Sequence, residues 1–144
     1  MNLLKISRKP AIVASPDDSV MVAVEKMVEN KVGAIAVIEN EKLVGIFTER
    51  DLMKRVVHPG KSVLNTRLGE AMTTNPKIAP EKMEVNDAFH SMTNEHFRHI
   101  PIVDRAGKVV GMLSVRHLMK EIAEQLSHDV EGLAAYISAD GIGG

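Results

Sequence analysis

The chain has 144 residues, of which 44% are apolar and 26% charged, with a formal net charge of −1 and no cysteine. A charge this close to zero predicts no binding to nucleic acid or anionic lipid, and the lack of cysteine excludes disulfides and thiol catalysis. Three Phe and one Tyr are too few for a base-stacking platform. No stretch approaches membrane-spanning length and the N-terminus lacks the apolar core of a signal peptide, so we expect a cytoplasmic protein.

The first half of the sequence predicts a short series of elements. An extended stretch over residues 10–16 (PAIVASP) precedes a helix whose apolar residues recur at helical spacing, namely Val20, Val24 and Met27. Two strands then flank a polar turn, at residues 34–38 (AIAVI) and 43–47 (LVGIF), and a second helix begins at Thr48.

The second half repeats this order. An extended stretch over residues 76–82 leads to a helix, two further strands at residues 100–104 and 108–113, and a helix that begins at Ser114. A shift of 65 residues aligns residues 23–38 with residues 88–103, and the shift becomes 66 after a loop that is one residue longer. Most of the chain therefore consists of two copies of one unit.

Because the short strands of one unit cannot bury both faces alone, we predict an α/β fold. In it, two β-α-β-β-α units related by a pseudo-twofold axis pack sheet to sheet. The predicted boundaries are residues 5–58 for the first repeat, 59–72 for the linker and start of the second, 73–125 for the second repeat, and 126–144 for a C-terminal helix and tail. The last helix is expected over residues 116–137, with an apolar stripe at Leu126, Val130, Leu133 and Ile137. This stripe has no evident partner in either unit and predicts a homodimer.

Two ten-residue segments carry the chemistry of the repeat, GIFTERDLMK at residues 45–54 and GMLSVRHLMK at residues 111–120. Thr48 corresponds to Ser114, but Asp51 corresponds to His117. Thr48 and Asp51 have the spacing of a helix-capping box, which would stabilise the helix by about 0.5–2 kcal/mol. The same geometry suits a ligand, because helix N–H groups attract phosphate and a carboxylate can accept both hydroxyls of a ribose.

The sequence resembles a tandem pair of CBS (cystathionine β-synthase) domains, the Bateman module. The resemblance rests on VGIFTERD, VVGMLSVRH, RHIPIVD and GEAMT, covers residues 5–125, and extends through VEGLAAYI to small stand-alone CBS-pair proteins. It implies two clefts between the repeats that often bind adenosine nucleotides. It also implies a module that reports nucleotide levels to a partner and performs no chemistry.

The resemblance implies one complete cleft. In it, Thr48 and Asp51 of the first repeat hold the ribose and phosphate, and the basic set Arg98, His99 and Arg116 of the second repeat holds the phosphate. The base is expected beside Gly45, Ile46, Asn75, Pro76 and Lys77. The second cleft, with Ser114, His117 and Arg50, has Gly33 and Ala34 in place of the cation pair and is expected to be incomplete. We therefore expect one nucleotide per chain.

These observations predict a regulatory sensor of AMP, ADP or ATP that acts through an unidentified partner protein or through its own oligomer, with AMP or ADP preferred. No catalytic motif is present, so we expect no enzyme and no catalytic cofactor. His90, His96 and His99 match no metal-binding spacing, so no metal is expected. The alternatives are a structural dimerisation module without ligand, a regulator of a thioredoxin-like partner, or a binder of NAD or S-adenosylmethionine.

Overall fold

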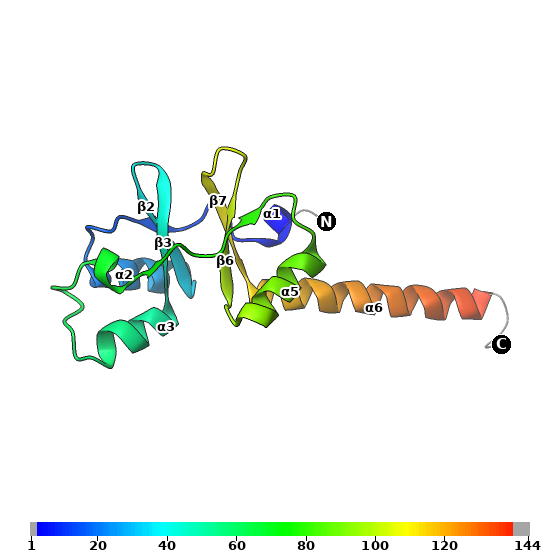
Figure 1. Cartoon of the computed structure of the whole chain (residues 1–144). Coiled ribbons are helices and arrows are strands. Elements are labelled where there is room, and N and C mark those ends of the chain that lie inside the picture. The colour runs from blue at the N-terminus through cyan, green and yellow to red at the C-terminus, as the bar shows by residue number, and fades with distance from the viewer. Residues whose placement is uncertain (1–2, 140–144) are drawn as a thin grey trace.

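The computed structural model of the protein describes residues 3–139, with side chains described through residue 132. The two repeats form two sheets (Figure 1). The first sheet has the order β1 (Val13–Ala14), β2 (Ala34–Glu39), β3 (Lys42–Thr48) and β4 (Thr73–Thr74). The second has the order β5 (Ala79–Pro80), β6 (His99–Val103) and β7 (Val109–Ser114). In each sheet a parallel strand precedes an antiparallel hairpin, β2–β3 or β6–β7.

The helices follow the predicted repeat. The first helix of each unit is α2 (Val20–Asn30) or α5 (Val85–Glu95), and the second begins at Thr48 or Ser114 as α3 (Glu49–Asp51) or α6 (Val115–Ala139). After α3 the helix continues as a π-helix, η1 (Leu52–Val57), and two short helices, α1 (Leu3–Ile6) and α4 (Leu68–Ala71), complete the described chain. The helix α6 agrees with the predicted helix over residues 116–137, whereas α1 was not predicted.

Each repeat gives its first extended segment to the sheet of the other repeat. In β4, Thr73 and Thr74 begin the second repeat but pair with Ile46 and Gly45 of β3. In the same way Arg8 forms a bridge with Met112 of β7, through two backbone hydrogen bonds of 2.9 Å. The approach of β4 requires a glycine, because a Cβ on Gly45 would lie 2.8 Å from the carbonyl oxygen of Thr73. This reciprocal exchange joins the two units into one body.

The core confirms that the two sheets pack against each other. Each repeat has its own buried cluster, around Phe47 in the first and Leu113 in the second. A third cluster joins them, where Ala34, Ala36 and Ile46 of the first sheet pack against Met112 of the second. The small alanine side chains of β2 allow close approach of β7, which contacts β2 directly. The predicted fold of two β-α-β-β-α units is therefore confirmed.

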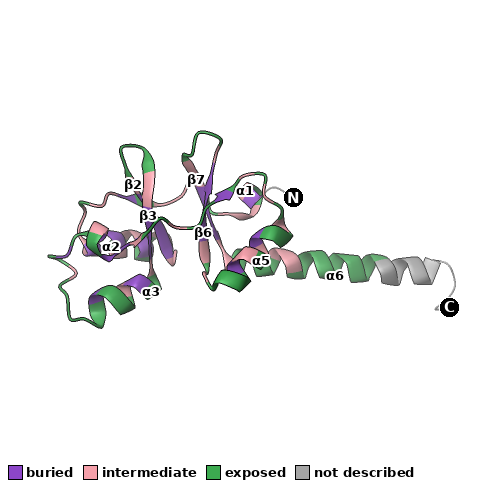
Figure 2. Cartoon of the chain, viewed as in Figure 1, coloured by how far each residue is buried: buried purple, intermediate pink, exposed green. Residues whose placement is uncertain are grey.

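The C-terminal helix α6 extends well beyond this body (Figure 1). Its first turns pack against α5 and α1 and bury Leu118 in the core of the second repeat. Further along, Leu126 is 60% exposed and Val130 65% exposed, and Figure 2 shows this part of the helix in the colour of exposed residues. The side chains of the predicted stripe at Leu133 and Ile137 lie outside the described side chains.

Candidate functional site

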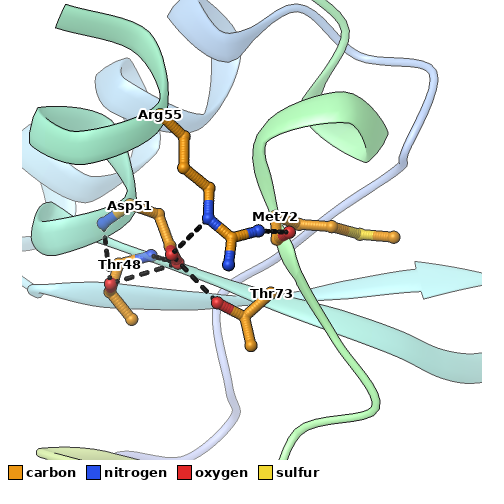
Figure 3. A network of polar contacts seen from close by, with 5 residues as sticks. All are labelled: Thr48, Asp51, Arg55, Met72 and Thr73. Carbon is orange, nitrogen blue, oxygen red and sulfur yellow. Dashed lines mark hydrogen bonds and ion pairs between the residues drawn. The ribbon is translucent and has the colours of Figure 1, made fainter. Parts of the chain in front are cut away.

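The Thr48–Asp51 pair forms a capping box at the start of α3 (Figure 3). Thr48 has extended backbone angles, and its Oγ1 accepts a hydrogen bond of 3.2 Å from the backbone N–H of Asp51. In return, Oδ2 of Asp51 accepts from the backbone N–H of Thr48 at 3.0 Å and from its hydroxyl at 3.1 Å. The local sequence pattern therefore does what a capping box requires.

The other carboxylate oxygen of Asp51 reaches the segment that begins the second repeat. Oδ1 accepts a hydrogen bond of 2.9 Å from the hydroxyl of Thr73 in β4 and lies 3.6 Å from Nε of Arg55. Arg55 also donates a 2.6 Å hydrogen bond to the carbonyl oxygen of Met72, so all five residues of Figure 3 belong to one network. With only 7% of Asp51 exposed, its carboxylate is a structural link between α3 and β4.

The second copy keeps the cap without the acid. Oγ of Ser114 accepts a hydrogen bond of 3.1 Å from the backbone N–H of His117. The side chain of His117 is exposed and lines a cavity at the junction of the two repeats. A hydroxyl alone is thus sufficient to cap the helix, and the position of the missing acid is open to a ligand.

This cavity has a volume of about 610 Å³ and two kinds of wall. One wall is apolar and includes Ile12, Val24, Met27, Val32 and Leu52 of the first repeat together with Met112. The other wall is basic, with the fully charged side chains of Arg8, Lys31, Arg98 and Arg116 together with His99 and His117. Glu49 is the carboxylate among the described lining residues. Such a cavity suits a ligand with one apolar part and one anionic part.

The structure brings the predicted basic set together, but not with Asp51. Arg98, His99 and Arg116 line the cavity with Ser114 and His117, whereas Thr48 and Asp51 are absent from its lining. The reason is the antiparallel register of β6 and β7, which pairs His99 with Ser114 of its own repeat. The predicted single cleft that combines Asp51 with Arg98 is therefore corrected to two separate groups of residues.

The remaining predicted residues also lie outside the cavity lining. Gly45 and Ile46 pair with β4, and Arg50 is exposed on α3. In the segment that follows β4, Asn75 has a φ of 47°, and Nζ of Lys77 forms an ion pair of 3.3 Å with Glu95. The predicted base-binding residues Gly45, Ile46, Asn75, Pro76 and Lys77 thus lie at the β3–β4 side of the first sheet.

The alignment of the two repeats at this junction is confirmed by matching backbone contacts. The carbonyl oxygen of Gly33 accepts from the N–H of Glu49 at 3.0 Å, and that of Arg98 accepts from the N–H of Val115 at 2.7 Å. Gly33 and Arg98 are therefore equivalent, as the shift of 65 residues predicts. The first repeat lacks a side chain where the second has a guanidinium group.

Sequence reasoning missed three charged residues of the cavity, Arg8, Lys31 and Glu49. Arg8 enters through the exchange of first segments, which pairs it with Met112 of β7. Lys31 ends α2 in the left-handed conformation, with a φ of 54°. Glu49 directly follows the capping threonine, and this adjacency was the signal available in the sequence.

The protonation of the basic wall is uneven. Burial lowers the pKa of His99 to about 4, and the positive charges of His117 and Arg98 lower it further in the same direction. His99 is therefore neutral near pH 7, so the positive charge of the cavity comes from its arginine and lysine side chains. A neutral imidazole can still donate one hydrogen bond to a phosphate oxygen.

Two other classes of site were sought in the described part of the chain. Within it, no group of three or more His, Asp or Glu side chains is placed to hold a metal ion. The described helices include none with the length and apolar character needed to cross a membrane.

A sequence model of the CBS domain matches residues 4–58 and 68–124. The chain belongs to the CBS domain family. Among curated relatives of this CBS pair, the mitochondrial protein CBSX3 of Arabidopsis thaliana is 34% identical over 127 residues. That match covers 84% of this chain and 61% of the relative, so the chain spans less than two thirds of CBSX3.

Solved structures of CBS-domain proteins share the fold. The CBS domain protein NE2398 superimposes with a TM-score of 0.78 at 36% identity, over 84% of this chain and 94% of that one. CBSX2, solved with AMP, gives a TM-score of 0.71 at 25% identity over 88% of this chain and 98% of CBSX2. The CBS pair of MJ0100, solved with 5′-methylthioadenosine and S-adenosylmethionine, gives 0.77 at 25% identity over 87% and 98%. Relatives of this CBS pair thus bind ligands that contain adenosine.

Proposed function

We propose that this CBS pair is a regulatory module that binds an adenosine phosphate in the basic cavity at the junction of its repeats. The observation that carries the proposal is the composition of the cavity, where four permanently charged basic side chains face one carboxylate across from an apolar wall. The apolar wall suits a purine, and the basic wall suits a phosphate. The AMP complex of CBSX2 supports this choice of ligand class.

Among adenosine ligands we propose AMP or ADP before ATP, because the basic side chains around one cavity suit one or two phosphates. S-adenosylmethionine is the second candidate, since MJ0100 binds it and the carboxylate of Glu49 could pair with an ammonium group. NAD would need a longer site than this cavity of about 610 Å³ alone. Occupancy of the cavity would be reported by a change in how the two repeats contact a partner.

That partner is proposed to include a second copy of the chain. Leu126 and Val130 leave an apolar face exposed on the part of α6 that projects from the body, and burying such a face is the usual driving force for association. A dimerisation module without ligand is the alternative, and a thioredoxin-like partner is a further one that no described residue favours. A cytoplasmic location stays a prediction, because CBSX3 is mitochondrial.

The test is a thermal-shift panel of AMP, ADP, ATP, NAD and S-adenosylmethionine, followed by titration calorimetry of the ligands that shift the melting temperature. Binding to the folded state alone stabilises it by about 2.7 kcal/mol at one hundred times the dissociation constant. We expect AMP or ADP to give the largest shift, with one nucleotide per chain. No shift at millimolar concentration with any adenosine ligand would support the alternative of a purely structural module.

A further inference from the structure

Glu49 holds a carboxylate at the boundary between the two walls of the cavity. It is the first residue of α3, and its neighbour one turn later, Leu52, belongs to the apolar wall. Toward the other wall, Glu49 Oε1 lies 2.9 Å from the place that a Cβ on Gly33 would occupy, and Cε1 of His99 lies 3.3 Å from the same place. The absence of a side chain at Gly33 therefore lets Glu49 and His99 approach one another.

This carboxylate has no partner within the described chain. Among the described side chains and backbone groups, none forms a hydrogen bond or an ion pair with the carboxylate of Glu49, although it shares the cavity with Arg8, Lys31, Arg98 and Arg116. Glu49 is exposed, so its oxygens face the open cavity. Both oxygens of Asp51, by contrast, are taken by Thr48, Thr73 and Arg55 in a buried network.

The charge of Glu49 is unfavourable for a site that binds only phosphate, because a carboxylate repels the ligand's anionic oxygens. A group that donates hydrogen bonds must therefore lie near it. In a nucleotide the sugar joins the base to the phosphate, and its hydroxyls are donors that a carboxylate accepts well. With the base on the apolar wall and the phosphate on the basic wall, the sugar lies at the boundary where Glu49 stands.

We propose that Glu49 accepts a hydrogen bond from a ribose hydroxyl of the bound ligand and thereby selects ribose over deoxyribose. The proposal rests on the function proposed above, and it gives to Glu49 the role that the family resemblance implies for Asp51. It applies to every ligand that contains adenosine, because all of them carry the same sugar.

The experiment compares AMP with 2′,3′-dideoxyadenosine 5′-monophosphate by titration calorimetry, for the natural chain, Glu49→Ala and Asp51→Asn. The two ligands differ only in the hydroxyls, so the ratio of their affinities isolates the sugar contact from changes in cavity charge. We expect the natural chain to prefer AMP by about tenfold or more, Glu49→Ala to bring the ratio near one, and Asp51→Asn to keep it. Thermal melting of each variant without ligand checks folding, and Glu49→Ala is expected to melt nearly normally.

A second variant moves the carboxylate without removing it. In Gly33→Ala the new Cβ would meet Oε1 of Glu49 and the ring of His99, so the carboxylate must shift. We expect this variant to lose the preference for ribose as Glu49→Ala does.

The outcomes separate the two proposals. An affinity ratio near one in the natural chain, or a ratio unchanged by Glu49→Ala, would overturn the role of Glu49 and leave the adenosine-phosphate site standing. A ratio lost in Asp51→Asn alone would assign the sugar to Asp51. If the natural chain binds neither ligand, both the proposed function and the role of Glu49 are overturned.

Discussion

Replacing Asp51 by Ala should destabilise the empty protein. The substitution removes a carboxylate that accepts three hydrogen bonds, from the N–H and hydroxyl of Thr48 and from the hydroxyl of Thr73, and that pairs with Arg55. A lost capping interaction costs about 0.5–2 kcal/mol, and a hydrogen bond to a charged group about 1.5–3 kcal/mol. Thr48 and Thr73 are only half-buried, so water replaces part of this loss. We therefore expect the free energy of unfolding to fall by about 2–4 kcal/mol.

The assay is thermal and denaturant unfolding of the empty protein, with His117→Ala as the matched control. His117 holds the equivalent position in the second repeat, but its exposed side chain has no printed hydrogen bond to lose, and only its backbone N–H contacts Ser114. For a domain of this size, 2–4 kcal/mol corresponds to a fall in melting temperature of about 6–12 °C, and the control should stay within about 0.5 kcal/mol. Equal melting of the two variants would refute the structural role of Asp51.

The same variant separates the two roles that the sequence left open. If Asp51 serves only the cap and the link to β4, then Asp51→Ala leaves the affinity of the folded protein for nucleotide nearly unchanged. If Asp51 holds the ribose, the affinity falls by roughly 1–3 kcal/mol. Titration calorimetry at a temperature where both proteins are folded decides between them.

Three further predictions concern the basic wall and the last helix. Arg98→Ala should weaken binding of AMP by roughly 1–3 kcal/mol, less as salt rises, whereas Lys77→Ala, outside the cavity lining, should not; equal losses in calorimetry would contradict the site. Because the folded pKa of His99, about 4, lies below its ordinary value of 6.5, the unfolded chain binds more protons between these values. Stability should therefore fall as pH drops from 6.5 to 4, and less so in His99→Gln; the same pH dependence of urea unfolding in both proteins would contradict this. Finally, Leu126→Glu with Val130→Glu should convert a dimer into a monomer by light scattering, and a natural chain that is already monomeric would rule out the dimer.

Most of the fold could be predicted because its signals are local or periodic. Val20, Val24 and Met27 mark a helix by their spacing, and the repeat of 65 residues places its copy without any knowledge of structure. The capping box at Thr48 is equally local, since both partners lie within one turn.

The grouping of residues in the cavity could not be predicted, because it depends on strand register. Arg98 and His99 lie beside Ser114 since β6 and β7 pair antiparallel, and the resemblance alone suggested the opposite side of the junction. Arg8 joins the cavity through a bridge to Met112, which is distant in the sequence. Periodicity fixes which face of an element is apolar, but it does not fix which distant segment completes a sheet.

The exchange of first segments also means that neither repeat is a self-sufficient half. A break in the chain between residues 59 and 67 would leave a first fragment that carries Arg8, an edge residue of the second sheet. The second fragment would carry β4, which completes the edge of the first sheet. Any rotation of one unit against the other pulls on a strand that belongs to the other unit's sheet, and a ligand at the junction acts on both sheets at once.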